Sequence, residues 1–213
     1  MKRGLFIVFE GPEGAGKSTQ IDRLAEALRA QGRDVITTRE PGGSELGREL
    51  RSLVLTPGKR VDPLAEFLLY AADRAQHVSE VIEPALAAGR DVISDRYTGA
   101  SLAYQGHGRG LDLGFVADVN AHATGGLSAD ITFLLDIDPE RGLLRVERRS
   151  ANGRDRLESE RLDFHDRVRA GYLQIAAADD TWLVIDAAAG EDDVFSVLAA
   201  AVERLLQEAK VGR

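Results

Sequence analysis

The chain has 213 residues, of which 44% are hydrophobic and 29% are charged. This length supports a sizeable core, and we expect residues 1–213 to form a single domain. The formal net charge of −8 argues against nucleic acid as a partner, and the absence of cysteine excludes disulfides and thiolate metal sites.

The first apolar run is short and begins after two basic residues, in the sequence MKRGLFIVFEG. It is too short for a signal peptide or a membrane span and leads directly into a glycine-rich stretch. We therefore expect a cytoplasmic protein that does not enter a membrane.

Apolar runs alternate with stretches of helical periodicity, the pattern of a parallel sheet covered by helices on both faces. Short runs rich in valine, isoleucine, leucine or phenylalanine predict strands at residues 5–10, 35–38, 91–95, 131–136 and 182–186. The sequence between the first two strands predicts a helix that ends at Gly32 and shares one apolar face, formed by Ile21, Leu24, Ala25 and Leu28. Further helices are predicted at residues 63–88 and 191–210.

One strongly polar stretch interrupts this pattern, with the sequence RRSANGRDRLESER at residues 148–161. We expect a mobile surface segment between two helices. Residues 140–169 contain nine arginines but also seven acidic residues, and this near balance favours an ion-paired, hinged lid over a nucleic-acid-binding arm.

The glycine-rich stretch at residues 11–18 reads GPEGAGKS and fits the pattern G-x-x-x-x-G-K-[ST] without a mismatch. A buried-type strand precedes it and an amphipathic helix follows it. Its glycines allow backbone N–H groups to turn inward, and the helix N-terminus adds a positive dipole, so the stretch predicts a nucleotide phosphate site. The predicted ATP-binding residues are Gly11, Pro12, Glu13, Gly14, Ala15, Gly16, Lys17, Ser18 and Thr19.

Two of these side chains have expected chemical roles. Lys17 is placed to reach the β- and γ-phosphates, and the Ser18 hydroxyl is placed to bind Mg²⁺. The structural alternative is a tight strand-to-helix turn that happens to contain a lysine. The motif does not define the reaction, because switches, motors, ligases and small-molecule kinases all share it. A guanine-specific N-K-x-D segment is absent from the sequence, which weakens the GTPase interpretation.

A second candidate region, DVISDRYTGASLAYQGHGRG at residues 91–110, follows a buried strand. Its strand therefore ends at the carboxyl edge of the sheet, where ligands sit in open α/β folds. Asp95 is expected to hold Mg²⁺ through water, and Arg96 to clamp a phosphate. The alternative is a structural ion pair between Asp95 and Arg96 that caps the strand.

Four motifs occur in order: GPEGAGKST, TREPGG at 38–43, DRY at 95–97 and AYQGHGRG at 103–110. Together with RLDFHDRVRAGYL further on, this arrangement resembles the bacterial thymidylate kinases over nearly the whole chain. The resemblance implies a three-layer P-loop NTPase fold with a five-stranded parallel sheet and a lid at about 148–161. It also implies phosphoryl transfer from ATP to dTMP with Mg²⁺, and a homodimer formed through apolar helices, with the helix ending near Ala88 as a candidate surface.

The resemblance also assigns an acceptor site to Glu13, Tyr70, Arg74, Arg96, Ser101, Tyr104 and Gln105. Arg96 would hold the dTMP phosphate and Glu13 would face the 3′-hydroxyl of the deoxyribose. Tyr70 would stack on thymine and Arg74 would donate to a thymine carbonyl, with Ser101 and Gln105 near the base edge. Tyr104 would crowd the 2′ carbon of the sugar.

The residues themselves leave alternatives open. Tyr70 and Tyr104 are also consistent with simple core packing, and Arg74 with a solvated surface charge. The bond between Glu40 and Pro41 is either a cis peptide that shapes the pocket, as the resemblance suggests, or part of an ordinary turn.

Some thymidylate kinases carry an arginine inside the P-loop, where this chain has Gly14. The resemblance is instead to the type whose lid supplies that charge, and Arg149 and Arg154 are the expected lid arginines. With Lys17, Asp95 and Arg96 they make up the predicted catalytic set. A kinase for another nucleoside monophosphate and an ATP-binding regulatory module remain the alternatives.

Overall fold

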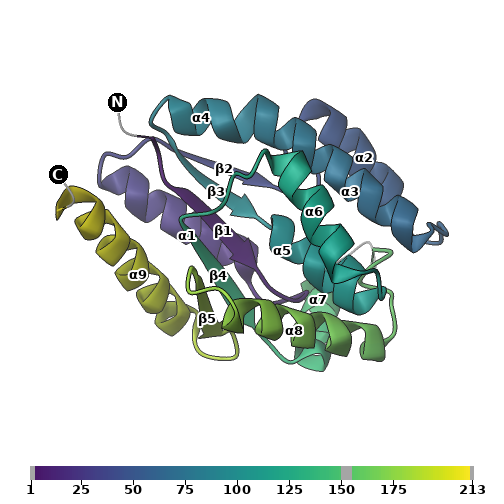
Figure 1. The fold of residues 1–213 in the computed structure, drawn as a ribbon. Coiled ribbons are helices and arrows are strands. Elements are labelled where there is room, and N and C mark those ends of the chain that lie inside the picture. The colour runs from purple at the N-terminus through teal and green to yellow at the C-terminus, as the bar shows by residue number, and fades with distance from the viewer. Residues whose placement is uncertain (1–2, 150–154, 212–213) are drawn as a thin grey trace.

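The computed structural model describes residues 3–149 and 155–211, with side chains through residue 148 and from 155 to 208. Within these ranges the chain forms a five-stranded sheet in the order β2-β3-β1-β4-β5, and every pair of neighbouring strands is parallel (Figure 1). The strands are β1 (Phe6–Glu10), β2 (Val35–Arg39), β3 (Asp91–Asp95), β4 (Ile131–Asp136) and β5 (Trp182–Asp186). The predicted fold class is confirmed, and each predicted strand agrees to within one residue at either end.

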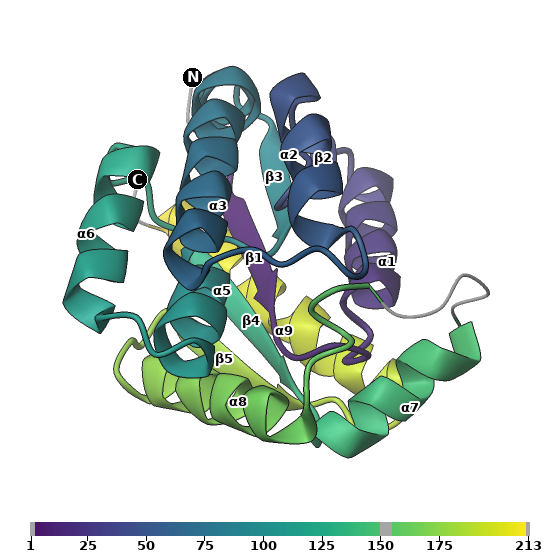
Figure 2. The same ribbon diagram turned by 90° about the vertical axis from the view of Figure 1, so that its right-hand side faces the viewer.

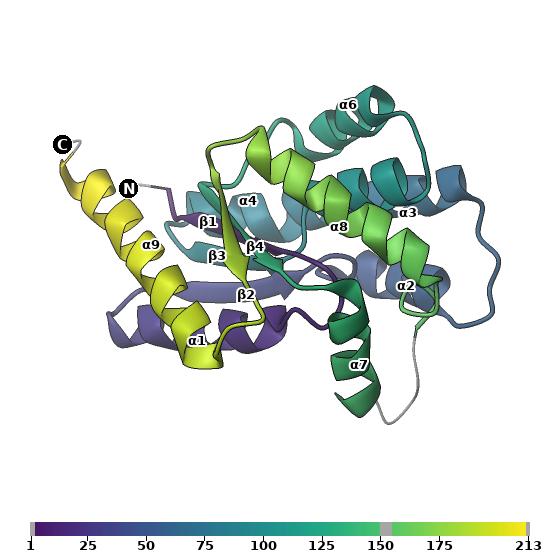
Figure 3. The same ribbon diagram turned by 90° about the horizontal axis from the view of Figure 1, so that it is seen from below.

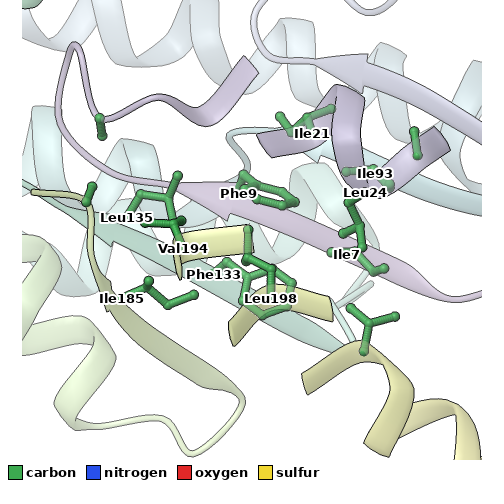
Figure 4. Packing of buried hydrophobic residues seen from close by; sticks show 14 of the residues in the cluster. Ile7, Phe9, Ile21, Leu24, Ile93, Phe133, Leu135, Ile185, Val194 and Leu198 are labelled. Carbon is green, nitrogen blue, oxygen red and sulfur yellow. The ribbon is translucent and has the colours of Figure 1, made fainter. Parts of the chain in front are cut away.

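One face of the sheet is covered by α1 (Lys17–Ala30) and α9 (Glu191–Val211). Ile7 and Phe9 of β1 point to this face, because alternate side chains of a strand face opposite sides. They pack with the apolar stripe of α1 and with Val194 and Leu198 of α9 (Figure 4). The predicted stripe of α1 is buried at all four positions.

Other helices lie on the opposite face of the sheet (Figures 1 and 2). Phe6 and Val8 of β1 pack there against the helical segment that ends in α4. The helices are α2 (Glu45–Leu55), α3 (Pro63–His77), α4 (Glu83–Ala87), α5 (Thr98–Ser101), α6 (Leu113–Thr124) and α8 (Leu162–Ala177). No helix of the described ranges is both long enough and apolar enough to cross a membrane.

The helix predicted at residues 63–88 exists, but it is not a uniform α-helix. A π-helical turn, Val78–Ile82, separates α3 from α4, and the backbone N–H of Glu83 donates to Val78 five residues back. Pro84 follows. Proline has no N–H to donate to the carbonyl four residues back, and its ring crowds that carbonyl, so the regular i to i−4 hydrogen bonding is interrupted at this point. A second π-helical segment, Leu102–Gly108, contains most of the AYQGHGRG motif.

The predicted lid begins at the end of α7 (Pro139–Arg149), which extends away from the sheet in Figure 3. Arg149 ends this helix, but its side chain lies outside the described residues, and so does the whole of Arg154. Residues 155–160 form a turn that packs against the body of the protein. The expectation of a surface segment is wrong for Arg156 and Leu157, which are buried.

Candidate active site

A pocket of about 280 Å³ opens at the carboxyl ends of β1, β2 and β3. It brings together predicted residues from four separate stretches of the chain, as parallel topology dictates. The predicted residues that line it are Glu13, Gly14, Ala15, Gly16, Lys17, Ser18, Tyr70, Arg74, Asp95, Arg96, Ser101, Tyr104 and Gln105. Gly11, Pro12 and Thr19 belong to the same loop and helix start but do not line the pocket.

The backbone of the glycine loop requires glycine for two different reasons. Gly11, Gly14 and Gly16 all have positive φ, which other residues rarely adopt. A Cβ on Gly11 would also lie only 2.4 Å from the Leu135 carbonyl oxygen, whereas the space beside Gly16 is open among the described residues. Gly16 caps the N-terminus of α1, so the open space lies where helix N–H groups bind an anion.

Lys17 folds back over this loop. Its Nζ donates to the carbonyl oxygens of Gly11 and Pro12 at 2.9 and 3.2 Å, and its side chain is buried. Burial lowers the pKa of Lys17, and the nearby Arg96 cation lowers it further. Two backbone carbonyl oxygens of the glycine loop thus hold the Lys17 amino group beside the pocket.

Gly14 of the glycine loop lies against the backbone of α7. A Cβ on Gly14 would come 2.1 Å from the Gly142 carbonyl oxygen, and a Cβ on Gly142 would come 2.2 Å from the carbonyl oxygen of Glu13. These two glycines allow α7 to lie directly on the P-loop. A side chain at position 14 would therefore displace the helix that leads into the lid.

Arg96 is the centre of a partly buried polar group at the end of β3. Its Nη2 donates to Glu13 Oε1 at 2.6 Å and to the Tyr104 hydroxyl at 3.0 Å, and its Nη1 donates to the Tyr172 hydroxyl at 2.9 Å. The Tyr104 hydroxyl donates to the same Glu13 oxygen at 2.8 Å. Arg96 thus pairs with Glu13 rather than with Asp95, contrary to the strand-capping alternative.

The cations beside Glu13 determine whether its carboxyl group is ionised. Burial opposes ionisation of Glu13, but the Arg96 and Lys17 cations outweigh it and lower the pKa of Glu13 to about 2. Glu13 is therefore ionised at neutral pH, and it keeps Arg96 aimed at the pocket. A bound phosphate would share this guanidinium group with Glu13.

Asp95 and Ser18, the two predicted magnesium ligands, both line the pocket. Asp95 Oδ1 is buried and accepts no hydrogen bond within the described residues, while Ser18 lies across the pocket at the start of α1. The described residues contain no group of three histidine, cysteine or acidic side chains arranged around a metal.

Arg74 is almost fully buried, so its interpretation as a solvated surface charge is wrong. Its Nε donates to Glu40 Oε2 at 2.8 Å, and its Nη1 donates to Ser101 Oγ at 3.0 Å and Asn120 Oδ1 at 2.6 Å. Nη2 donates to the Tyr97 carbonyl oxygen at 2.9 Å. Because guanidinium has five N–H groups, one Nη2 hydrogen remains available at the pocket wall.

Tyr70 and Tyr104 are buried, as the core interpretation expected, yet both also line the pocket. The Tyr70 hydroxyl has no hydrogen-bond partner among the residues with described side chains.

Gln105 Nε2 donates to Glu66 Oε1 at 2.8 Å, which leaves its amide oxygen for other partners. The peptide bond between Glu40 and Pro41 at the pocket edge is cis.

Two pocket cations were missed in the sequence. Arg39 ends β2 within the TREPGG motif, and Arg51 comes from α2, which had not been delimited. Arg51 Nη1 donates to the Pro41 carbonyl oxygen at 2.9 Å, and burial, with Arg39 nearby, lowers the pKa of Arg51. Arg39 could have been predicted because it lies within the TREPGG motif. Arg51 lies outside every motif, so its neighbours in the sequence give no indication of its position.

A neighbouring buried carboxyl predicts a pH effect on stability. Asp73 of α3 is fully buried, and this burial, together with the Glu40 charge, raises the pKa of Asp73 to about 6 from 3.8. A raised pKa means that the folded state binds the proton more tightly, so this group stabilises the fold at low pH. That contribution is lost as the pH rises through 6.

Asp73→Asn should therefore gain stability relative to the wild type as the pH rises. Between pH 4.5 and 7.5 the difference in unfolding free energy should change by about 2 kcal/mol in favour of the variant. Urea unfolding at a series of pH values measures it. A difference that stays constant over this range would contradict the assignment.

The comparisons with known proteins agree with this geometry. The thymidylate kinase family model matches residues 9–197. The chain is 52% identical to thymidylate kinase of Deinococcus radiodurans, over 95% of this chain and 98% of that protein. It is 51% identical to thymidylate kinase of Solidesulfovibrio magneticus, over 95% of this chain and 100% of that protein. The predicted resemblance is thus confirmed: the chain belongs to the thymidylate kinase family.

Proposed function

We propose that this protein is a thymidylate kinase that transfers the γ-phosphate of ATP to dTMP, giving dTDP and ADP for dTTP synthesis. The observation that supports this most is the juxtaposition of Lys17 and Arg96 in one pocket. Lys17 belongs to a donor-phosphate cradle, and Arg96 is aimed into the same space from β3. Phosphoryl transfer requires such alignment of two anions more than it requires covalent help from the protein.

The acceptor is held by pocket residues from outside the glycine loop, together with Glu13 of that loop. Arg96, with Arg39 and Arg51, binds the dTMP phosphate, and Glu13 faces the 3′-hydroxyl. Tyr70 stacks on thymine, the free Nη2 hydrogen of Arg74 reaches a thymine carbonyl, and Ser101 and Gln105 lie at the base edge. Tyr104 disfavours a 2′-hydroxyl by crowding the 2′ carbon of the sugar. Its ring is held in place by burial and by Arg96, whose guanidinium carbon lies 4.8 Å from the ring centroid.

Mg²⁺ is the proposed cofactor, held by Ser18 and, through water, by Asp95. When bound, it neutralises charge on the ATP phosphates. The unpartnered buried oxygen of Asp95 supports this assignment. Arg149 and Arg154 are proposed to supply further positive charge from the lid, and a phosphate oxygen of dTMP is an adequate nucleophile without a general base.

An assay of ADP release with dTMP, dUMP, UMP, CMP and AMP tests the proposed function. We expect ATP consumption to depend on the acceptor and to be fastest with dTMP, with dTDP as the product. Preference for a ribonucleotide would overturn the roles of Tyr104 and Tyr70. ATP binding without acceptor-dependent turnover would favour the regulatory-module alternative instead.

The protein is further proposed to act in the cytoplasm and as a homodimer. Support for the dimer comes from large apolar side chains exposed by more than two fifths on neighbouring helices. They are Leu46 and Leu53 of α2, Leu64 and Leu68 of α3, and Phe115 of α6. This surface lies at the beginning of the helical stretch that ends near Ala88.

Leu68→Glu is expected to convert the dimer to a monomer, because it places a charge in the centre of this apolar face. Light scattering after size-exclusion chromatography measures the mass. Leu173→Glu, at an exposed leucine of α8, is the matched control and should leave the dimer intact. A wild-type mass equal to one chain would contradict the proposal.

A further inference from the structure

Glu10, the last residue of β1, is a fully buried carboxyl group to which no role has been assigned so far. It does not line the pocket that holds the proposed substrates. Burial raises the pKa of Glu10 to about 6, partly offset by the nearby Arg96. A buried acid of this kind needs compensating donors, and all three of its donors lie next to Arg96 in the fold.

Glu10 first holds the backbone at Arg96. Its Oε1 accepts hydrogen bonds at 2.9 Å from the backbone N–H groups of Tyr97 and Ala100. The Tyr97 N–H belongs to the peptide directly after Arg96, which has a φ of 75°, a left-handed conformation rarely adopted by a non-glycine residue. Such a conformation persists only where the surroundings fix it.

The approach of this backbone to Glu10 depends on a glycine. A Cβ on Gly99 would come 3.1 Å from Glu10 Oε1 and 2.5 Å from the Trp182 ring. A side chain at position 99 would therefore clash with the Trp182 ring and crowd the carboxylate at the start of α5.

Glu10 also holds the side chain of Arg96, through a bridging tyrosine. The Tyr172 hydroxyl donates to Glu10 Oε2 at 2.8 Å and accepts from Arg96 Nη1 at 2.9 Å. Tyr172 is fully buried in α8, so its ring cannot swing away from this position. Glu13 holds Nη2 from the pocket side, and Tyr172 fixes the other end of the guanidinium group.

We infer that Glu10 is the positioning residue for Arg96, fixing both its backbone and, through Tyr172, the orientation of its guanidinium group for the acceptor phosphate. This inference rests on the proposed role of Arg96. Glu10 acts without touching the substrates. Its removal should therefore impair acceptor binding and transfer but leave ATP binding unchanged.

Tyr172→Phe is the most selective test, because it removes one oxygen atom and breaks only the bridge to Arg96. We expect the KM for dTMP to rise about tenfold, as for a lost hydrogen bond to a charged group, with the KM for ATP within about twofold of the wild type. Tyr97→Phe is the matched control. It also removes a tyrosine hydroxyl, one that donates to Leu127, and should change neither KM.

Glu10→Gln supplies the second arm of the experiment. The amide oxygen of the variant side chain can still accept from the two backbone N–H groups, but its amide nitrogen cannot accept from Tyr172. We expect the same rise in the KM for dTMP as with Tyr172→Phe, and no further rise in the double variant, because both changes break one path. Equal effects of Tyr172→Phe and Tyr97→Phe, or additive effects in the double variant, would overturn the inference.

Arg96→Lys separates this failure from a failure of the proposed site. The lysine keeps the charge but loses the bidentate geometry, so the KM for dTMP should rise at least as much as with Tyr172→Phe. If Arg96→Lys left that KM unchanged, the role of Arg96 itself would be wrong. If Arg96→Lys raised the KM for dTMP but Tyr172→Phe and Glu10→Gln did not, the role of Arg96 would stand and the positioning role inferred for Glu10 would be wrong.

Discussion

Replacement of Lys17 by methionine should lower kcat by about a thousandfold or more, while the affinity for dTMP stays close to that of the wild type. Electrostatic stabilisation of the transferring phosphoryl group is usually the largest contribution in such reactions, and Lys17 is the proposed cation at the donor phosphates. Methionine has a similar length and suits a buried position. Single-turnover ADP formation and calorimetric titration with dTMP measure the two quantities.

The matched control is Lys59→Met, which removes an exposed lysine outside the pocket. It should leave kcat unchanged. A Lys17→Met enzyme that kept more than about a tenth of the wild-type kcat would contradict the placement of Lys17 at the transferring phosphate.

Replacement of Arg96 by methionine should reduce kcat/KM for dTMP by roughly a hundredfold to a thousandfold. The variant loses the acceptor-phosphate clamp, and it leaves the ionised Glu13 without its ion-pair partner at 2.6 Å. Truncating one partner of a buried, hydrogen-bonded charge pair typically costs about 2–5 kcal/mol, and the two side chains of this pair are only 15% and 19% exposed. Steady-state kinetics with dTMP as the varied substrate, at saturating ATP, measures the loss.

The control for this change is Arg90→Met, at a partly exposed arginine that pairs with Asp34 and does not line the pocket. Its kinetics should match the wild type. If Arg96→Met raised the KM for ATP as strongly as that for dTMP, Arg96 would belong to the donor site rather than to the acceptor site.

The strands and the phosphate loop were predictable because their signals are local. A parallel strand buried on both faces appears as a continuous apolar run, as in β1, where all five residues are buried. The glycine loop is likewise defined by eight consecutive residues between a strand and a helix. Both predictions needed only neighbouring residues along the chain.

The surroundings of Arg74 were not predictable in this way. Its partners Glu40, Ser101 and Asn120 lie 34, 27 and 46 residues away, and each comes from a different element. A charged residue on a helix indicates solvent unless such partners are known, because an unpaired buried charge is costly. The family resemblance therefore identified Arg74 as an acceptor-site residue, but it could not predict that the side chain is buried.

The same limit explains the polar segment. Its composition indicates a surface position, yet Arg156 is buried because its Nη2 lies 2.6 Å from the fully buried Glu66, and its Nε donates to the Val54 carbonyl oxygen. Glu66 lies 90 residues earlier in the chain, so the pair has no local signal. Leu157 follows Arg156 into the core beside the pocket.

A crystal structure with dTMP and a non-hydrolysable ATP analogue tests most directly whether donor and acceptor anions share this one space. It should place the analogue's terminal phosphate at Lys17 and the dTMP phosphate within hydrogen-bonding distance of Arg96, with thymine against Tyr70. Thymidine monophosphate bound at any other surface, with the Arg96 side empty, would contradict the assignment of both halves of the pocket.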